Sequence, residues 1–403
     1  MGDAYARLAA LIARKSNWAE TRRLAERALA LEPENCIAQL ALADADIGEK
    51  NFESAERRIR LFLSSGHETT HQRIYALYLL GDALDRQDRI ADAFAAYSNA
   101  NAYLYNEYAP KMTQPGVETG LALIKRLIAH FENAPVWPKP QTLPPRAPDD
   151  TSAALAFLMG FMRSGTTLLG QILASNPGIV TLEEKPVLAD AARDFIYGPG
   201  LQRLPSLTAP EIARYNRVYW KHVRNLGVDV RDKVVIDKMP MNTICLPAIA
   251  KFFPQAKIIM ALRDPRDVVF SCFRRPLTVT RFSFDFLSLE QTALCYDASM
   301  RAVDIFRHKM PLEVHEIRNE DVIADFDYRI ASLCRFLQVE WTPAMKSFAK
   351  DSRKRAIATP SAQQVARGIN SEGVAQWRRY AKQLEPILPI LDPWVRRYGY
   401  ASE

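Results

Sequence analysis

The run Leu155–Thr167 ends in residues whose types and spacing suit the binding of an anion. It begins as an apolar stretch, passes through a turn that contains glycine, and is followed by a predicted helix at Leu168–Ala174. The residues of the turn and of the helix start are Arg163, Ser164, Gly165, Thr166 and Thr167. The first N–H groups of a helix have no intrahelical partner, and the helix dipole favours negative charge there. The segment therefore predicts a binding site for an anionic group.

The motif differs from the phosphate-binding loop of nucleotide triphosphatases in one respect. That loop ends in Gly-Lys-Ser/Thr, where the lysine reaches the terminal phosphates and the hydroxyl holds magnesium. This chain has no lysine there, and its cation, Arg163, precedes the glycine. An arginine fork and two hydroxyls can bind an anion directly, and no provision for a metal is visible.

These residues resemble a known family. Arg-Ser-Gly-Thr-Thr-Leu-Leu after a strand is similar to the 5′-phosphosulfate loop of sulfotransferases that use 3′-phosphoadenylyl sulfate. Those enzymes usually have proline before the arginine, where this chain has Met162. The change removes a rigid φ but no hydrogen-bonding group.

A second motif follows about 100 residues later. The apolar run Lys257–Leu262 leads into Arg263, and Pro265 lies near the start of the next predicted helix, where a missing N–H costs nothing. Ser271 follows about two helical turns on, and an arginine with a hydroxyl can hold a phosphate dianion. The pattern resembles the 3′-phosphate motif of the same family. A role in a surface ion pair stays open for Arg266.

Two further residues are candidates for the chemistry of sulfuryl transfer. In protein-tyrosine sulfotransferases, a Glu-Glu pair follows the loop arginine and its second member is the catalytic base. Glu184 lies 21 residues after Arg163 and matches that position, although a solvated acidic turn stays an alternative. Lys238, before Met-Pro, resembles the Lys-x-Pro element whose lysine contacts the donor. A lysine that closes a buried strand needs an anionic partner.

The resemblance extends toward the C-terminus, with one departure. Ser361, Gln364 and Arg367 match a segment of the protein-tyrosine sulfotransferases in which a lysine, replaced here by Arg367, closes over the phosphates of the cofactor. The family has Arg-Tyr-Glu near the nucleotide, whereas this chain reads Arg-Asn-Glu at 318–320. Stacking on adenine would have to come from another residue.

The elements that must position these residues form an α/β pattern. Strand-like runs at 153–159, 233–237, 257–262 and 312–317 alternate with helical stretches. We therefore expect a P-loop-like parallel sheet with helices on both faces, the sulfotransferase fold, with ligands at the carboxyl ends of the strands. This domain is expected at 149–403, after a helix and a proline-rich linker at 111–148.

Residues 1–110 are expected to form an all-α domain that precedes it. Asn-Trp-Ala-Glu at 17–20 and Asn-Phe-Glu-Ser at 51–54 recur 34 residues apart, which is the period of tetratricopeptide repeats. A third unit fits residues 73–101. Such pairs of helices stack into a superhelix whose concave face suits a peptide or a neighbouring domain. An irregular helical bundle is the alternative.

Composition supports a globular protein with anionic ligands. The 403 residues carry a formal net charge of +7, 48% are hydrophobic and 25% are charged. No apolar run approaches the roughly 18 residues that span a bilayer, and no secretory signal is visible. The five cysteines form no Cys-x-x-Cys pair, and no cluster has the spacing of metal ligands. We expect a cytoplasmic protein without a bound metal or nucleic-acid partner, and assembly into a homodimer stays open.

The combined interpretation is a sulfotransferase. It would move a sulfuryl group from 3′-phosphoadenylyl sulfate, its co-substrate, to an acceptor hydroxyl, with Glu184 as base. The repeats could present a peptide or protein, which makes a tyrosine acceptor plausible. A glycan or a small-molecule alcohol stays open as acceptor. The alternatives are a P-loop nucleotide kinase, which needs the missing Gly-Lys-Ser/Thr, and an inactive repeat scaffold.

Overall fold

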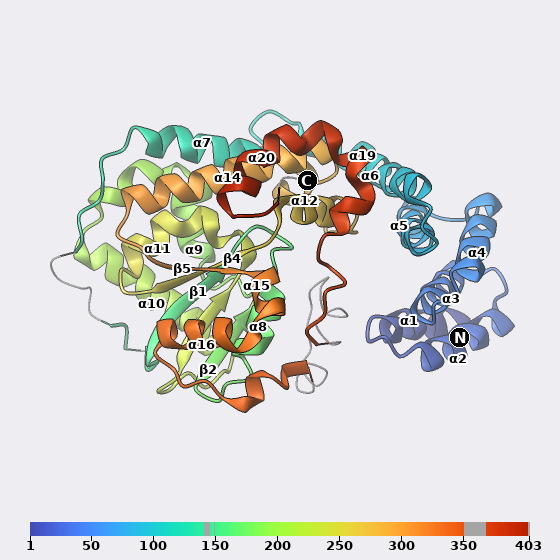
Figure 1. Ribbon diagram of the computed structural model, residues 1–403, viewed down its shortest axis with the longest axis horizontal. Helices are drawn as coiled ribbons and strands as arrows, with labels where there is room; N and C mark the ends of the chain where they lie inside the picture. The colour runs from blue at the N-terminus through green and yellow to red at the C-terminus, as the bar shows by residue number, and fades with distance from the viewer. Residues whose placement is uncertain (141–145, 149, 350–367, 402–403) are drawn as a thin grey trace. The chain divides into compact units, whose positions relative to one another are not determined.

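The computed structural model describes residues 1–140, 146–148, 150–349 and 368–401, and it divides into two compact units. The first unit consists of 1–120, 269–292 and 376–389, and the second of 121–268, 293–375 and 390–403. Each unit therefore contains segments that are far apart in the sequence. Figure 1 shows the elements of both, coloured along the chain.

The second unit is built on a sheet of five parallel strands in the order β2-β3-β1-β4-β5. The strands are β1 (Ala154–Met159), β2 (Ile179–Glu183), β3 (Val234–Lys238), β4 (Lys257–Leu262) and β5 (Glu313–Arg318). Four of them confirm the runs predicted from the sequence. The edge strand β2 was not among the predicted runs, because its apolar stretch is short and only partly buried. Its Ile-Val-Thr run after Pro177-Gly178 is the β-branched signal that identifies it.

Helices cover both faces of this sheet, as predicted (Figure 1). On one face, residues of α8 (Thr166–Leu173) and α16 (Phe326–Leu337) form a core with β1, β3, β4 and β5. On the other face, Phe157 of β1 packs against Tyr219 of α10 (Ala209–Asn225), with ring centroids 6.2 Å apart. The central strands β1, β3 and β4 are mostly buried because each crossover helix buries one apolar face against them, whereas the edge strands β2 and β5 are partly exposed.

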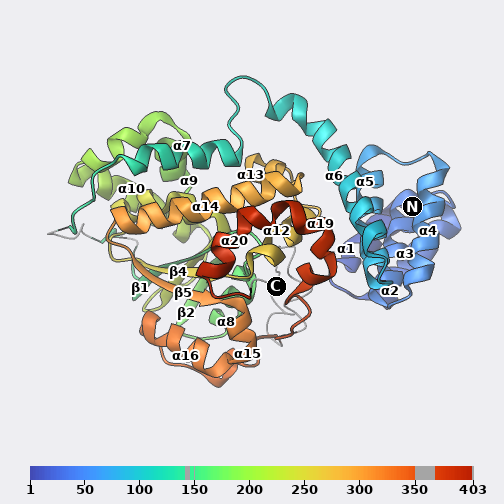
Figure 2. The same ribbon diagram turned by 45° about the horizontal axis from the view of Figure 1, so that its top comes forward.

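Two further helices run alongside each other on this second face, as Figures 1 and 2 both show. They are α7 (Gly120–Glu132) and α14 (Leu289–Lys309), joined by an edge-to-face contact of 5.1 Å between Phe131 and Phe306. The shorter helices of the second unit are α9 (Ala189–Ala191), α11 (Leu246–Phe252), α15 (Asn319–Ala324) and α20 (Leu388–Arg397), and α12 (Pro265–Phe273) contributes to both units. A π-helical turn at Ala192–Tyr197 and 3₁₀ turns at Pro199–Ser206, Pro240–Cys245 and Pro343–Met345 complete it.

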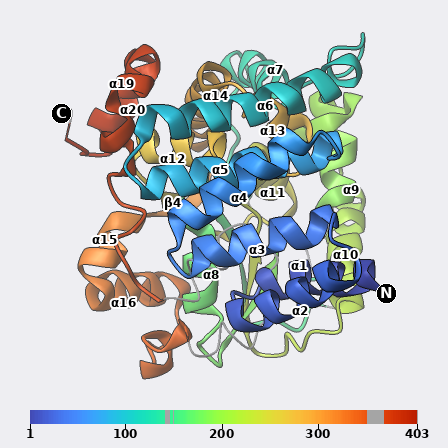
Figure 3. The ribbon, with the colours of Figure 1, turned by 90° about the vertical axis from the view of Figure 1, so that its right-hand side faces the viewer.

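Three consecutive pairs of helices form most of the first unit, and Figure 3 shows them side by side. They are α1 (Gly2–Ala13) with α2 (Trp18–Leu31), α3 (Cys36–Gly48) with α4 (Phe52–Ser65), and α5 (Thr70–Arg86) with α6 (Ile90–Met112). Asn17 caps α2 by accepting the N–H of Glu20. The N-terminal region is thus helical throughout, as expected, whereas its assignment to the tetratricopeptide repeats stays a prediction.

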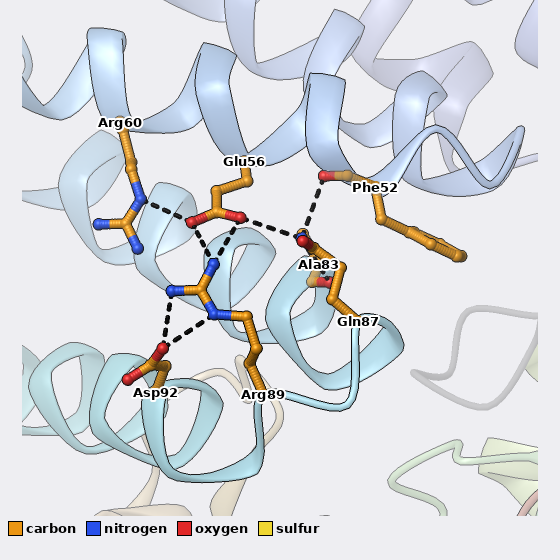
Figure 4. Close-up of polar contacts among 7 residues, drawn as sticks. All are labelled: Phe52, Glu56, Arg60, Ala83, Gln87, Arg89 and Asp92. Carbon is orange, nitrogen blue, oxygen red and sulfur yellow. Dashed lines mark hydrogen bonds and ion pairs between the residues drawn. The ribbon is translucent and has the colours of Figure 1, made fainter.

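A polar cluster around Glu56 joins successive pairs (Figure 4). The Glu56 carboxylate accepts hydrogen bonds from Arg60 on its own helix α4, and from Arg89 at 2.8 and 2.9 Å and Gln87 at 3.1 Å in the turn between α5 and α6. Arg89 also binds Asp92. Burial opposes ionisation of Glu56, but the hydrogen bonds from Arg60, Arg89 and Gln87 outweigh it and lower the pKa of this carboxyl. The cluster therefore stabilises the packing of α4 on the third pair.

Two later segments of the chain complete the first unit. Asp85 of α5 accepts hydrogen bonds from Arg379 at 2.6 Å and from the hydroxyl of Tyr380 at 2.7 Å, and Arg274 lies 3.6 Å away. The ring of Tyr380 packs on Phe270 at 4.1 Å. The elements of these segments are α13 (Arg281–Asp285), α19 (Ala381–Leu384) and 3₁₀ turns at Gln376–Tyr380 and Glu385–Ile387. The helical pairs thus bury a carboxylate that only residues far along the chain neutralise.

Candidate functional site

The carboxyl end of every strand in the sheet carries a polar residue. These residues are Arg163 in the loop after β1, Glu183 and Glu184 at the end of β2, Lys238 at the end of β3, Arg263 directly after β4, and Asn319 directly after β5. The chain order reverses at β1, which lies between β3 and β4. Open α/β sheets bind their ligands at such a switch point, on the carboxyl side of the strands. The topology therefore brings the predicted residues to one edge.

The loop after β1 has the conformation of an anion cradle. Arg163 has a φ of +70° and Gly165 a φ of +97°, so two left-handed residues turn the chain into α8, which begins at Thr166. A positive φ is unfavourable for arginine and persists only where the surroundings impose it. The turn directs the first N–H groups of α8 toward the edge of the sheet. The side chains of Ser164, Thr166 and Thr167 are buried around it.

Arg263 connects this loop to the segment after residue 367. Its Nη1 donates to the carbonyl oxygen of Arg163 at 3.1 Å, and its Nη2 donates to the carbonyl oxygen of Gly373. Asp267, one helical turn further along, lies 4.0 Å from Nη2. The Nε of Arg263 is buried and has no hydrogen-bond partner among the described residues. The guanidinium is thus held in place with donor capacity left over.

A small pocket of about 50 Å³ lies beside these groups. It is lined by Arg163, Gly165, Thr167, Leu168, Arg263, Asn319, Ile323, Gly368, Asn370 and Gly373. Two arginines and a threonine supply donors for an anion, whereas Leu168 and Ile323 supply apolar wall. Gly165 is needed where it stands, because a Cβ there would lie 2.7 Å from Oδ1 of Asn319. The donor set suits a phosphate-bearing ligand with an apolar or aromatic portion.

Glu183, Glu184 and Lys238 form one ionic cluster. The Nζ of Lys238 lies 2.7 Å from Oε1 of Glu184 and 2.8 Å from Oε2 of Glu183. The lysine side chain is fully buried, whereas Glu184 is 36% exposed. Glu184 has a φ of +52°, and its N–H donates to the carbonyl oxygen of Lys238 at 2.9 Å. A partly exposed carboxylate is a candidate general base, although neither Glu184 nor Lys238 is among the residues that line the pocket.

Asp237 precedes Lys238 and points to the other face of the sheet. Its Oδ2 accepts a hydrogen bond of 3.2 Å from the hydroxyl of Tyr219. Burial raises the pKa of Asp237 to about 7, although this hydrogen bond opposes the rise. Burial, together with the charge of Asp237, also raises the pKa of the Cys245 thiol to about 12. These groups lie on the face of the sheet that α10 covers, and they are not among the residues that line the pocket.

Some predicted residues do not join the pocket. Ser271 is buried near the end of α12, in the part of that helix that belongs to the first unit. Arg266 is held in a bidentate pair with Asp264, at 3.0 and 2.7 Å, and also donates to the carbonyl oxygen of Ala401. Arg266 therefore forms an ion pair, which was the alternative to a binding role, but this pair is buried and not at the surface. Ser361, Gln364 and Arg367 lie outside the described residues.

Sequence reasoning missed several residues of this edge. Gln171 donates to Glu183 at 3.1 Å, and Ile323 of α15 lines the pocket beside Asn319. The N–H of Ala375 donates to Asp267 at 2.7 Å, which holds the segment that carries Gly373. Asn319 was noted only for the tyrosine that it replaces. Its position directly after a strand was the signal that could have identified it.

The second unit is thus a P-loop-like α/β domain with a candidate site for an anion at the carboxyl ends of its strands. Residues 156–343, which begin in β1 and run past α16, match the model of the Sulfotransferase family. No helix in the described part of the chain is long and apolar enough to cross a membrane. Nor do the described residues contain a group of three or more His, Cys, Asp or Glu side chains that could hold a metal ion.

Similar proteins include several named sulfotransferases. An uncharacterized protein of Aquifex aeolicus is 24% identical over 402 residues, which is 94% of this chain and 50% of that protein. The chain thus spans half the length of that relative. Protein-tyrosine sulfotransferase 1 of Danio rerio is 24% identical over 267 residues, which cover 61% of this chain and 72% of that enzyme.

Solved structures of sulfotransferases are also similar to part of the chain. The sulfotransferase domain of the Synechococcus olefin synthase has 23% identity and a TM-score of 0.41, over 60% of this chain and 90% of that one. Mouse sulfotransferase SULT7A1, complexed with PAP, has 18% identity and a TM-score of 0.37, over 60% and 85%.

Proposed function

We propose that the protein is a sulfotransferase that moves a sulfuryl group from 3′-phosphoadenylyl sulfate to an acceptor hydroxyl. The observation that carries the proposal is the hydrogen bond between Arg263 and the loop at Arg163, which brings two anion motifs to one pocket. A ligand with two separate phosphate groups needs two such centres. The family match over residues 156–343 and the protein-tyrosine sulfotransferase relatives support the same activity.

The residues of the pocket have the chemistry to hold this co-substrate. Arg163, the N–H groups at the start of α8 and the hydroxyl of Thr167 would bind the 5′-phosphosulfate, with Ser164, Gly165 and Thr166 shaping the turn. Arg263 would bind the 3′-phosphate with its spare donor. Arg367 is carried over from the family resemblance as a further phosphate ligand. Leu168 and Ile323 can face the nucleobase in place of an aromatic ring.

Glu184 and Lys238 would carry out the transfer. Glu184 takes the proton of the acceptor hydroxyl, whose oxygen forms a new bond to sulfur. The bond between sulfur and the 5′-phosphate oxygen breaks, and Lys238 balances the charge that develops on the departing oxygen. As in phosphoryl transfer, positioning and electrostatics supply most of the rate. The exposure of Glu184 and the burial of Lys238 suit these separate roles.

The acceptor is proposed to be a hydroxyl of a peptide or protein, with tyrosine as the first candidate. The relatives named protein-tyrosine sulfotransferases motivate this choice. The three helix pairs, if they are tetratricopeptide repeats, would present such an acceptor on their concave face. Glycans and small alcohols are the comparison substrates.

Calorimetric titration tests the binding step. Metal-free protein is titrated with 3′-phosphoadenosine 5′-phosphate and, separately, with ATP, using wild type, Arg263→Ala and the control Arg231→Ala, whose side chain is 76% exposed. We expect the bisphosphate to bind wild type and the control, and Arg263→Ala to bind it about 100-fold more weakly, because a charge-assisted contact of about 2–3 kcal/mol is lost. In a further titration with magnesium added, a preference for ATP over the bisphosphate would contradict the proposal and favour a kinase.

Transfer itself is measured with radiolabelled 3′-phosphoadenylyl sulfate and a panel of tyrosine peptides, simple phenols and sugars. Incorporation into tyrosine peptides alone would support the acceptor class. Incorporation only into sugars or small alcohols would keep the sulfotransferase proposal and replace its acceptor. Binding of the bisphosphate without transfer to any acceptor would favour the inactive scaffold.

A further inference from the structure

Lys238 is held by two carboxylates at once, although the proposed mechanism uses only one of them. Its ammonium group lies 2.7 Å from Glu184 and 2.8 Å from Glu183, and none of its side chain is exposed. A buried ammonium ion is costly unless anions surround it. If Glu184 turns toward an acceptor, Glu183 is the carboxylate of this cluster that stays beside the lysine.

Glu183 is itself fixed by groups of α8. Its Oε1 accepts a hydrogen bond of 3.1 Å from the side chain of Gln171, a buried residue of α8. The backbone of α8 also approaches it closely, because a Cβ at Gly170 would lie 3.0 Å from the same oxygen. Glu183 ends β2, whereas Glu184 begins the loop with a positive φ. The carboxylate of Glu183 is therefore held by a hydrogen bond from α8, whereas Glu184 lies in a turn.

We propose that Glu183, braced by Gln171, is a positioning residue that holds Lys238 in place when Glu184 acts on the acceptor. This inference rests on the proposed sulfotransferase function. The two adjacent glutamates then have separate tasks: Glu184 moves a proton, and Glu183 keeps the ammonium group aimed at the departing oxygen. Without Glu183, the lysine would follow Glu184 and the two catalytic groups would neutralise each other.

The test compares Glu183→Gln with the matched control Glu313→Gln. Glutamine keeps the shape of the side chain and loses its charge, and Glu313 is exposed at the amino end of β5, the opposite edge of the same sheet. We expect Glu183→Gln to lower kcat by about 10- to 100-fold, the effect of a misplaced catalytic group, while KM for 3′-phosphoadenylyl sulfate changes less than about threefold. The control should retain wild-type values.

A double-mutant cycle separates positioning from a structural role. In a Lys238→Met background, Glu183→Gln should cost little further activity, because the group that it positions is absent. An equal further loss would overturn the proposal. Glu183→Asp, which keeps the charge but shortens the reach, should give an intermediate kcat and replaces the glutamine variant if that one does not fold. Wild-type kcat in Glu183→Asp and Glu183→Gln would also overturn it.

A measurement that needs no turnover keeps this inference distinct from the proposed function. Peptide mass spectrometry after treatment with an amine-acylating reagent reports how well Lys238 is held. We expect acylation at Lys238 to be severalfold faster in Glu183→Gln than in Glu313→Gln. Equal rates would overturn the role of Glu183 even in an active enzyme. Suppose that acylation is faster in Glu183→Gln but the protein binds no 3′-phosphoadenosine 5′-phosphate. That result would support the positioning of Lys238 by Glu183 and contradict only the proposed reaction.

Discussion

The guanidinium of Arg263 donates a hydrogen bond of 3.1 Å to the carbonyl oxygen of Arg163, a residue 100 positions earlier in the chain. The contact forms because β1 and β4 are neighbouring parallel strands, so that the residues after their carboxyl ends meet. The left-handed φ of Arg163 turns its carbonyl group toward that partner. Two anion motifs that are separate in the sequence thereby become one site.

Replacing Gly165 with alanine should impair the loop. Its φ is +97°, and the new Cβ would lie 2.7 Å from Oδ1 of Asn319. We expect Gly165→Ala to weaken binding of 3′-phosphoadenosine 5′-phosphate by at least about tenfold, read by calorimetry. The control is Gly227→Ala, where φ is +71° but nothing lies within 4 Å of the added atom. The control should lose about 1 kcal/mol of stability and no affinity. Equal affinity in the two variants would contradict a role for the loop.

Glu184→Gln should abolish most turnover while binding persists. Removal of a general base lowers the rate by about 100- to 10,000-fold, and the amide can still accept from Lys238. The measurement is kcat with the best acceptor, together with calorimetry of the bisphosphate. Glu313→Gln serves again as the control because its side chain is exposed at the far edge of the sheet. A loss of less than about threefold would mean that another group takes the proton.

Asp237→Asn should change how stability depends on pH. Burial raises the pKa of Asp237 to about 7, so the folded protein binds a proton that the unfolded chain releases near pH 4. The stabilisation is complete below about pH 4 and is lost as the pH rises through about 7. Relative to the variant, wild type should therefore lose about 4 kcal/mol between those limits, which is roughly three pKa units at about 1.4 kcal/mol each, measured by urea unfolding. The exposed Asp232→Asn is the control. A difference that does not vary with pH would refute the assignment.

Glu56→Gln should weaken the helical unit most at neutral pH. Hydrogen bonds from Arg60, Arg89 and Gln87 overcome burial and lower the pKa of Glu56, so its contribution is present above the unfolded pKa of about 4.3. That contribution is lost as the pH falls through the lower folded value. We expect a loss of about 1 kcal/mol at pH 7 in urea unfolding, shrinking toward zero in acid. Glu53→Gln, an exposed change one turn earlier on the same helix, should have little effect at any pH.

Much of the sheet-containing unit was predictable because its signals are local. Three strands, β1, β3 and β4, are short runs rich in apolar residues, and the loop at Arg163 and the turn at Arg263 follow β1 and β4. The edge strand β2 escaped prediction because it is brief and only partly buried, so it lacks a continuous apolar run. The resemblance to protein-tyrosine sulfotransferases predicts Glu184 as the base, whereas the contacts of Glu183 with Lys238 and with Gln171 are seen only in the structure.

The amino-acid sequence by itself determined the alternation of strands and helices, the two anion motifs and the helical pairs of the N-terminal region, since each depends on neighbours within a few residues. Only the tertiary structure decided which carboxylates face Lys238, that Asp237 is buried beneath the site, and that residues 269–292 and 376–389 fold with the helical pairs. Asp85 illustrates the reason. Its partners Arg274, Arg379 and Tyr380 lie about 190 to 295 positions away, and desolvation of a charge depends on every chain segment that packs around it.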